Sequence, residues 1–140
     1  MLLFSKKKIK KLAKKKIKKK YYPKFIIDVE INFSDINLKF LKILNRFEPF
    51  GKENKKPIFL SKKVFHNGFY KKIGKNKSHL MLKFFQENYN NGIISFFFNI
   101  SLENYNNIKN YKYYNIIYNI DYFFNKNYFS INILDIKNIL

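Results

Sequence analysis

The chain has 140 residues, enough for one domain with a modest core. Its formal net charge of +20, with 29 Lys and Arg against 9 Asp and Glu, points to a polyanionic partner, either nucleic acid or an anionic membrane surface. The absence of cysteine excludes disulfides and thiolate metal sites, and fits the cytoplasmic location that we expect. The abundance of residues with AT-rich codons predicts a reduced, AT-rich bacterial genome, and this bias accounts for part of the charge.

Residues 1–22 are predicted to form a basic connecting helix. Lysines dominate this segment, and Ile9, Leu12, Ala13 and Ile17 recur at helical spacing as a narrow apolar stripe. Its apolar run is too short for a secretory signal, and no run approaches the ~20 apolar residues that span a bilayer. A solvated helix that connects to a neighbouring module is the simplest interpretation. A membrane-surface helix and a transit peptide are the alternatives.

Residues 23–56 are predicted to form a strand and a helix that lead into the main body. Pro23 ends the basic helix, and the alternation of apolar residues that follows predicts a short strand over residues 24–33. Ser34 is the predicted N-cap of a second helix over residues 35–47. Together these two elements form a predicted lead-in to the rest of the chain.

Residues 57–140 are predicted to form a barrel of five strands. The predicted strands cover residues 62–73, 79–86, 93–99, 111–124 and 128–137. Residues 101–107 read as a helical turn or a loop between the third and fourth strands. Five strands with a break at this point are typical of an OB-type barrel, although the count also allows an SH3-like barrel or a small sandwich. The predicted fold class is therefore mainly β.

One set of residues carries a family resemblance. It reads Pro49-Phe50-Gly51-x-x-Asn54-x-x-Pro57-x-Phe59, followed by Gly74 and by His79-Leu80. This pattern resembles the opening of the C-terminal OB domain of RecJ, the bacterial single-strand-specific exonuclease, and the similarity extends over essentially the whole chain. The sequence departs from the family pattern at Glu53, Lys55 and Met81, where the family has Gly, Pro and Lys.

The resemblance implies an OB fold and a role in binding single-stranded DNA for a 5′–3′ exonuclease of DNA repair and recombination. In RecJ the metals are held by an Asp-His-His cluster in a separate module, and neither His66 nor His79 has such neighbours here. We therefore assign no catalytic or metal-binding residue, and do not expect this chain to hydrolyse DNA alone. A complete RecJ-like enzyme would use divalent Mn or Mg, but we expect no cofactor on this chain.

The expected partners are single-stranded DNA and a separate polypeptide that carries the catalytic module, as this chain looks like a split subunit, a remnant or a piece of such an enzyme. No membrane is expected, and the oligomeric state is left open. Two other functions also fit the composition. One is a basic structural protein of a ribosome or another ribonucleoprotein, and the other is a peripheral membrane protein anchored by residues 1–20.

An OB barrel binds single strands with cationic side chains along the phosphates and aromatic rings against the bases. The predicted nucleic-acid-binding residues are Lys62, Lys63, Phe69, Tyr70, Lys71, Lys72, Lys75, Lys77, His79, Lys83, Lys126 and Tyr128. For each lysine the alternative is ordinary solvated surface, and for His79 it is a structural hydrogen bond.

Other aromatic residues are predicted to lie in the core, because they fall on apolar alternations. They are Phe84, Phe96, Phe98, Tyr118 and Phe129. Tyr122 and Phe123, near the last turn, are candidates for a wall facing the first two strands. Asp121 stands where the family has Asn, and an unpaired carboxylate in a DNA groove would repel phosphate.

Overall fold

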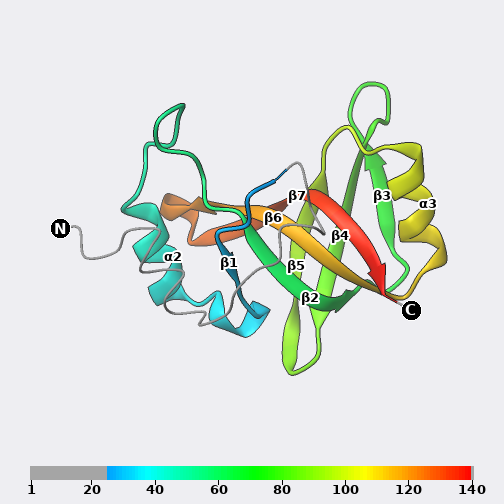
Figure 1. Ribbon diagram of the computed structural model, residues 1–140, viewed down its shortest axis with the longest axis horizontal. Helices are drawn as coiled ribbons and strands as arrows, with labels where there is room; N and C mark the ends of the chain where they lie inside the picture. Colours follow the sequence, from blue (N-terminus) through cyan, green and yellow to red (C-terminus); the bar gives the residue numbers. More distant parts are fainter. Residues whose placement is uncertain (1–24, 140) are drawn as a thin grey trace.

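The computed structural model describes residues 25–139, and the predicted helix over residues 1–22 lies outside this range (Figure 1). In chain order the elements are β1 (Val29–Glu30), the 3-10 helix η2 (Phe33–Asp35), α2 (Leu38–Asn45), β2 (Phe59–Phe65), β3 (Tyr70–Ile73), β4 (His79–Gln86), β5 (Tyr89–Phe97), α3 (Leu102–Asn110), β6 (Tyr113–Phe123), the 3-10 helix η3 (Phe124–Lys126) and β7 (Tyr128–Ile139). The protein is mainly β, as predicted.

The strands form one sheet whose two halves curve toward each other. Their order is β1-β2-β6-β7-β5-β4-β3, and β2 also pairs with β4. This additional antiparallel pairing, between residues 64–65 and 85–86, brings the sheet round into a partial ring. Within the ring only β5 and β7 run parallel, and α3 connects β5 to β6. This topology is consistent with an OB-type fold.

The seven strands differ from the prediction of five barrel strands with one lead-in strand. The predicted strand over residues 62–73 is in fact parts of two strands, β2 and β3, because the chain turns at Gly68, whose φ of 89° is readily adopted only by glycine. The lead-in strand is shorter than predicted, since only Val29–Glu30 pair with β2. Its alternation nevertheless predicts burial, because Ile27, Val29, Ile31 and Phe33 are buried and only Phe25, the first of the alternating residues, is half-buried.

The predicted cap of the second helix is wrong. The helix begins at Leu38, and Asn37 caps it by accepting a hydrogen bond from the backbone N–H of Phe40 at 2.9 Å. Ser34 instead lies in η2, where the Asp35 carboxylate accepts from the backbone N–H of Asn32 at 2.9 Å. The segment left open as a turn or loop is the helix α3, which Ser101 caps.

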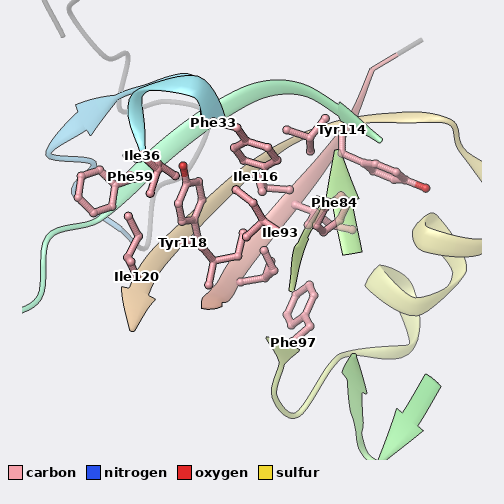
Figure 2. Packing of buried hydrophobic residues seen from close by; sticks show 14 of the residues in the cluster. Phe33, Ile36, Phe59, Phe84, Ile93, Phe97, Tyr114, Ile116, Tyr118 and Ile120 are labelled. Atoms are coloured by element: carbon pink, nitrogen blue, oxygen red, sulfur yellow. The ribbon is translucent and has the colours of Figure 1, made fainter. Parts of the chain in front are cut away.

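The core fills the inside of the curved sheet (Figure 2). Alternate residues of β4, β5, β6 and β7 point inward, and the lead-in segment and α2 close the open side. Residues on both sides of the predicted boundary between 56 and 57 therefore share one core, as Phe33 and Phe59 do in their contacts with Tyr118. Of the predicted core rings, Phe84 and Tyr118 are fully buried.

A buried polar contact ties the lead-in segment to β2 and β6. The Ser61 hydroxyl and the Tyr118 hydroxyl are 2.7 Å apart, and Ser61 Oγ also donates to the Ile31 carbonyl at 2.7 Å. Burial raises the pKa of Tyr118, so its hydroxyl remains protonated at all ordinary pH values. Because both side chains are buried, each satisfies a polar group that water cannot reach.

The family-pattern residues build the scaffold. The side-chain amide of Asn54 donates to the carbonyls of Phe47 and Pro49, and its backbone N–H and C=O both bond to Gly51, which closes the loop after α2. The Glu48–Pro49 peptide bond is cis. Pro57, Phe59 and Leu80 are buried, and Phe50 is half-buried. None of these side chains needs a ligand to explain its place in the pattern.

The His79 ring lies so close to Gly74 that there is no room for a side chain at position 74. Gly74 has a φ of 93°, and a Cβ at this position would lie 2.6 Å from His79 Cδ2. His79 Nδ1 in turn accepts a hydrogen bond from the backbone N–H of Asn99 at 2.9 Å, and the Ile100 N–H donates to the Ser78 carbonyl. The turn between β3 and β4 is thereby held against the segment after β5.

The first prediction concerns this close approach. Replacing Gly74 by Ala should lower the free energy of unfolding by about 1–3 kcal/mol, because the positive φ and the His79 ring both oppose a Cβ. Gly51→Ala is the matched control, since no atom lies within 4 Å of the added methyl group and its φ is not in the positive range. Urea denaturation of both variants provides the measurement, and equal stability of the two would contradict the role assigned to Gly74.

The second prediction concerns the buried hydroxyl pair. Ser61→Ala should cost about 1–3 kcal/mol, because it leaves the Tyr118 hydroxyl buried with one partner fewer. Tyr118→Phe should cost less, since Ser61 keeps its bond to the Ile31 carbonyl. The double variant should lose less stability than the sum of the two single changes, as measured by a thermodynamic cycle in urea. Additive losses would show that the two hydroxyls do not interact.

Candidate nucleic-acid interface

The outer face of β3, β4 and β5 carries side chains that the core does not use. Because Leu80, Leu82 and Phe84 point inward from β4, the residues between them must point outward. Strand pairing aligns these outward residues with those of the neighbouring strands in rows, since directly opposite residues lie on the same face of a sheet. We call this surface the outer face and define it by the residues of its three rows.

In two of the three rows a lysine lies beside apolar side chains. The outer face consists of Ile73, His79 and Phe98 in one row, Lys71, Met81 and Phe96 in the next, and Lys83 and Ile94 in the third. The middle row continues to β7, where Phe96 pairs with Asn132. Lys71 and Lys83 are exposed, and Met81, Ile94 and Phe96 are half-buried. A row of this kind offers ammonium groups and apolar surface within one strand spacing of each other.

Three rings meet at one edge of the outer face. Phe96 and Phe98 are stacked, with centroids 5.7 Å apart and an interplanar angle of 9°. The His79 ring meets Phe98 edge to face at 5.2 Å. Phe98 is 49% exposed, so one part of this ring cluster is open to solvent. An exposed ring supported by a second ring is a suitable platform for stacking a planar ligand.

A groove of about 490 Å³ runs along the other edge of the outer face. Phe69, Lys71, Met81, Lys83 and Ile94 contribute to its lining. Phe69 follows the Gly68 turn and is 79% exposed, the highest exposure among the large hydrophobic residues of the described chain. The groove therefore combines an exposed ring with two lysines, which is the combination that binds single strands in OB domains.

Several predicted contact residues come together here. Lys71, His79 and Lys83 lie on the outer face, and Phe69 lines its groove. Lys75 and Lys77 are exposed in the turn that joins β3 to β4, directly before His79. His79 accepts a hydrogen bond from Asn99, which is the structural role given above as the alternative for this residue. Its half-buried ring nevertheless faces outward.

Tyr70 and Lys72 lie on the opposite face of β3. Their strand partners are the buried residues Leu82 and Leu80, so both side chains face α3. The Tyr70 ring contacts Tyr105 edge to face at 6.0 Å, and Lys72 Nζ lies 4.3 Å from the centroid of the same Tyr105 ring. The Tyr70 ring and Lys72 thus contact α3 while Lys71 faces outward, although Tyr70 is also part of the lining of the groove.

Four further predicted residues lie away from the outer face. Lys62 on β2 pairs with Glu30 at 3.4 Å, and Lys63 occupies an irregularity of β2 with a φ of 56°. Lys126 and Tyr128 lie at the β6–β7 hairpin, which Figure 1 shows at the end of the molecule where α2 lies. The β3–β4 turn and α3 lie toward the other end.

The prediction that Phe96 and Phe98 lie in the core is wrong for both rings. Phe96 points outward because its neighbours Ser95 and Phe97 are the buried residues of β5, and Phe98 lies just beyond the end of that strand. Met81 and Ile94 were also missed. The strict alternation of β4 from His79 to Phe84 was the available signal, because it places Met81 on the same side as His79 and Lys83.

Asp121 does not present an unpaired carboxylate. Its Oδ1 atom accepts from Lys56 Nζ, and its Oδ2 atom accepts from Asn132 Nδ2 at 2.6 Å. The lysine neutralises the charge that would otherwise repel a phosphate. The other histidine, His66, is also structural, since its Nε2 atom lies 2.8 Å from the Ile108 carbonyl oxygen and its ring stacks on Tyr114.

Within residues 25–139 no group of three or more His, Cys, Asp or Glu side chains is arranged to hold a metal ion. Over the same range no helix is both long enough and apolar enough to cross a membrane. The chemistry available at the outer face is therefore that of its lysines, rings and imidazole, which can bind a polyanion with planar groups.

Two comparisons with known proteins bear on the family of this domain. A search of the curated proteins found no match. In a comparison with protein families, residues 27–135 match the RecJ OB domain. The matched range covers most of the chain, from the lead-in segment to β7, and includes every row of the outer face. On this match the chain belongs to the RecJ OB domain family.

Proposed function

We propose that this domain binds single-stranded DNA along the outer face of β3, β4 and β5, and that it does so for a RecJ-type 5′–3′ exonuclease in DNA repair and recombination. The observation that carries the proposal is that Lys71 shares a row with Met81 and Phe96, and Lys83 shares the next row with Ile94. In OB folds the second and third strands of the barrel and the adjoining loops bind oligonucleotides, and β4 and β5 hold the corresponding place if the partial ring is read as such a barrel.

The geometry favours a single strand over a duplex. Bases can reach Phe69 and Phe98 only when they are unpaired, because the faces of paired bases are covered by their neighbours in the stack. The lysines of the outer face would follow the phosphates at the same time. Stacking of this kind tolerates any sequence, which suits a nuclease that degrades strands of all sequences.

The hydrolytic step belongs to another module. Hydrolysis of a phosphodiester by two metal ions requires carboxylates that converge on the cations, and residues 25–139 contain no such group. We propose that the domain holds the strand while a RecJ-like catalytic module, with its own Mn or Mg, cleaves it. Lys126 and Tyr128 remain predicted contacts that would need a strand long enough to reach the hairpin.

The third prediction tests the lysines of the outer face. Lys71→Gln and Lys83→Gln should each weaken binding of single-stranded DNA and lower the salt dependence, by a slope of about 0.7 for each phosphate that is no longer neutralised. Lys72→Gln is the matched control, because it removes the same charge from the neighbouring residue but faces α3. Fluorescence anisotropy over a range of salt concentrations measures both quantities.

Equal effects of Lys71→Gln and Lys72→Gln would contradict a specific path and indicate that only net charge matters. Duplex DNA and anionic vesicles serve as competing ligands in the same assay. Binding that is equally tight to single strands, duplex and vesicles would overturn the proposed function, and would favour a general polyanion-binding role such as that of a ribonucleoprotein component.

The fourth prediction tests the ring platform. Phe98→Leu should reduce affinity for single-stranded DNA by about fivefold or more, because stacking on an aromatic ring contributes about 1–3 kcal/mol per base. With an oligonucleotide too short to reach the β6–β7 hairpin, Phe123→Leu is the matched control, since Phe123 lies on that hairpin and is similarly exposed, at 46% against 49%. Titration with an oligonucleotide carrying a fluorescent base reports the stacking directly. A larger loss from Phe123→Leu would move the binding surface to the hairpin.

A further inference from the structure

The turn between β2 and β3, residues 66–69, supplies the most exposed ring of the proposed binding surface. Asn67, Gly68 and Phe69 all line the groove of the outer face, and Phe69 is 79% exposed. In the described chain no backbone–backbone hydrogen bond closes this turn, and two side chains hold it instead. Asn67 Oδ1 accepts from the Phe69 N–H at 3.1 Å. His66 Nδ1 accepts from the Gly68 N–H at 3.0 Å.

The partners of His66 assign a role to each of its ring nitrogens. Nε2 lies 2.8 Å from the Ile108 carbonyl oxygen, which can only accept, so Nε2 carries a hydrogen. Nδ1 accepts from the Gly68 N–H, so it carries none. The β2–β3 turn therefore requires the neutral imidazole of His66, with its hydrogen on Nε2.

A proton added to His66 binds at Nδ1 and acts on the turn. The new Nδ1–H faces the Gly68 N–H, and two donors cannot form a hydrogen bond with each other. The Nε2 bond survives, because Ile108 lies in the last turn of α3, where the carbonyl groups favour a positive charge. The ring thus stays anchored to α3, whereas the turn loses one of the two side-chain bonds that hold it.

The tyrosines around the His66 ring keep their protons when the imidazole titrates. The ring stacks on Tyr114 of β6 at 5.9 Å, and it meets Tyr70 of β3 and Phe84 of β4 edge to face. Burial raises the pKa of Tyr114 to about 12, and burial together with Tyr105 raises the pKa of Tyr70. Histidine, in contrast, is the side chain that ordinarily gains its charge between about pH 5 and pH 8.

The charged side chains of the elements around this ring have other partners. Lys109 of α3 and Lys72 of β3 lie over the Tyr105 ring. On β2, Lys62 pairs with Glu30 at 3.4 Å, and the two lysines of the outer face line the groove. The titration that acts on the turn is therefore that of the imidazole itself.

We propose that neutral His66 is a positioning residue, which holds the β2–β3 turn so that Phe69 is presented to a base, and that protonation of Nδ1 releases the turn and weakens binding of single-stranded DNA. This inference rests on the proposed function, because Phe69 is one of its two stacking rings. The form competent for binding lacks the proton, so the affinity is full above the titration of His66 and falls below it. Charge alone has the opposite sign, since added protons attract a polyanion more strongly.

The experiment measures binding of a dT oligonucleotide at about pH 8 and about pH 5.5 at constant ionic strength, because thymine takes up no proton in this range. The unaltered chain should bind about fivefold more weakly at the lower pH, which is the loss expected when one base no longer stacks. Phe69→Leu should bind more weakly at the higher pH and show no such step, because the ring on which the turn acts is missing.

His66→Asn separates the hydrogen bond from the titration. Asparagine Oδ1 takes the place of Nδ1 and accepts from the Gly68 N–H, but it does not gain a proton in this range. This variant should therefore lack the step and bind more tightly than Phe69→Leu at the lower pH. Circular dichroism checks that both variants are folded.

Nuclear magnetic resonance of the unaltered chain observes the turn without DNA. The chemical shift of the Gly68 amide hydrogen should follow the protonation of His66, as expected for the loss of its acceptor. The amide of Leu82, inside β4, is the reference and should not follow it. This measurement and Phe69→Leu still test the inference if His66→Asn does not fold.

Binding that tightens or stays constant as the pH falls would overturn the inference while the proposed function stands. An equal step in all three proteins would assign the pH dependence to another group and overturn it too, as would a Gly68 amide that does not respond to His66. Absence of binding to single strands by the unaltered chain at about pH 8 would overturn the proposed function together with this inference.

Discussion

The alternation of inward and outward residues along β4 is the constraint on which the rest of the structure depends. Leu80, Leu82 and Phe84 are fully or almost fully buried, and their burial in the core stabilises the sheet. Because consecutive side chains of a strand point to opposite faces, this burial forces His79, Met81 and Lys83 outward. The register of β3 and β5 with β4 then adds Lys71, Ile94 and Phe96 to the same surface. The proposed binding face is thus determined by the packing of the opposite face.

The family-pattern residues act on this arrangement indirectly. Phe59 and Leu80 are core residues, Asn54 closes the loop after α2, and Gly74 leaves room for the His79 ring. Apart from His79, none is placed on the proposed binding face. A pattern of this kind identifies a family by the geometry it imposes on the backbone, whereas the residues that touch the ligand lie on surfaces where many side chains satisfy the same physical requirement.

The sequence predicted the mainly β class, the bounds of β4 and the family, because each depends on local alternation or on residues with special backbone geometry. It did not predict the division of residues 62–73 into two strands, since Gly68 there stands in a run that otherwise reads as one strand. The sequence also did not predict which residues of β3 lie on each face of the sheet. Lys71 and Lys72 are equivalent in composition, and only the pairing with β4 shows that one faces outward and the other faces Tyr105.

The net charge and the local geometry make different contributions to binding. A charge of +20 attracts any polyanion, and its contribution falls as salt rises, whichever lysines are involved. Stacking on an exposed ring requires an unpaired base of any kind, and salt affects it far less. The outer face combines the two contributions, because its rows carry ammonium groups and Phe98 supplies an exposed ring. In the proposed function, selectivity for single strands would therefore come from Phe69 and Phe98, while the lysines would supply affinity that a duplex shares.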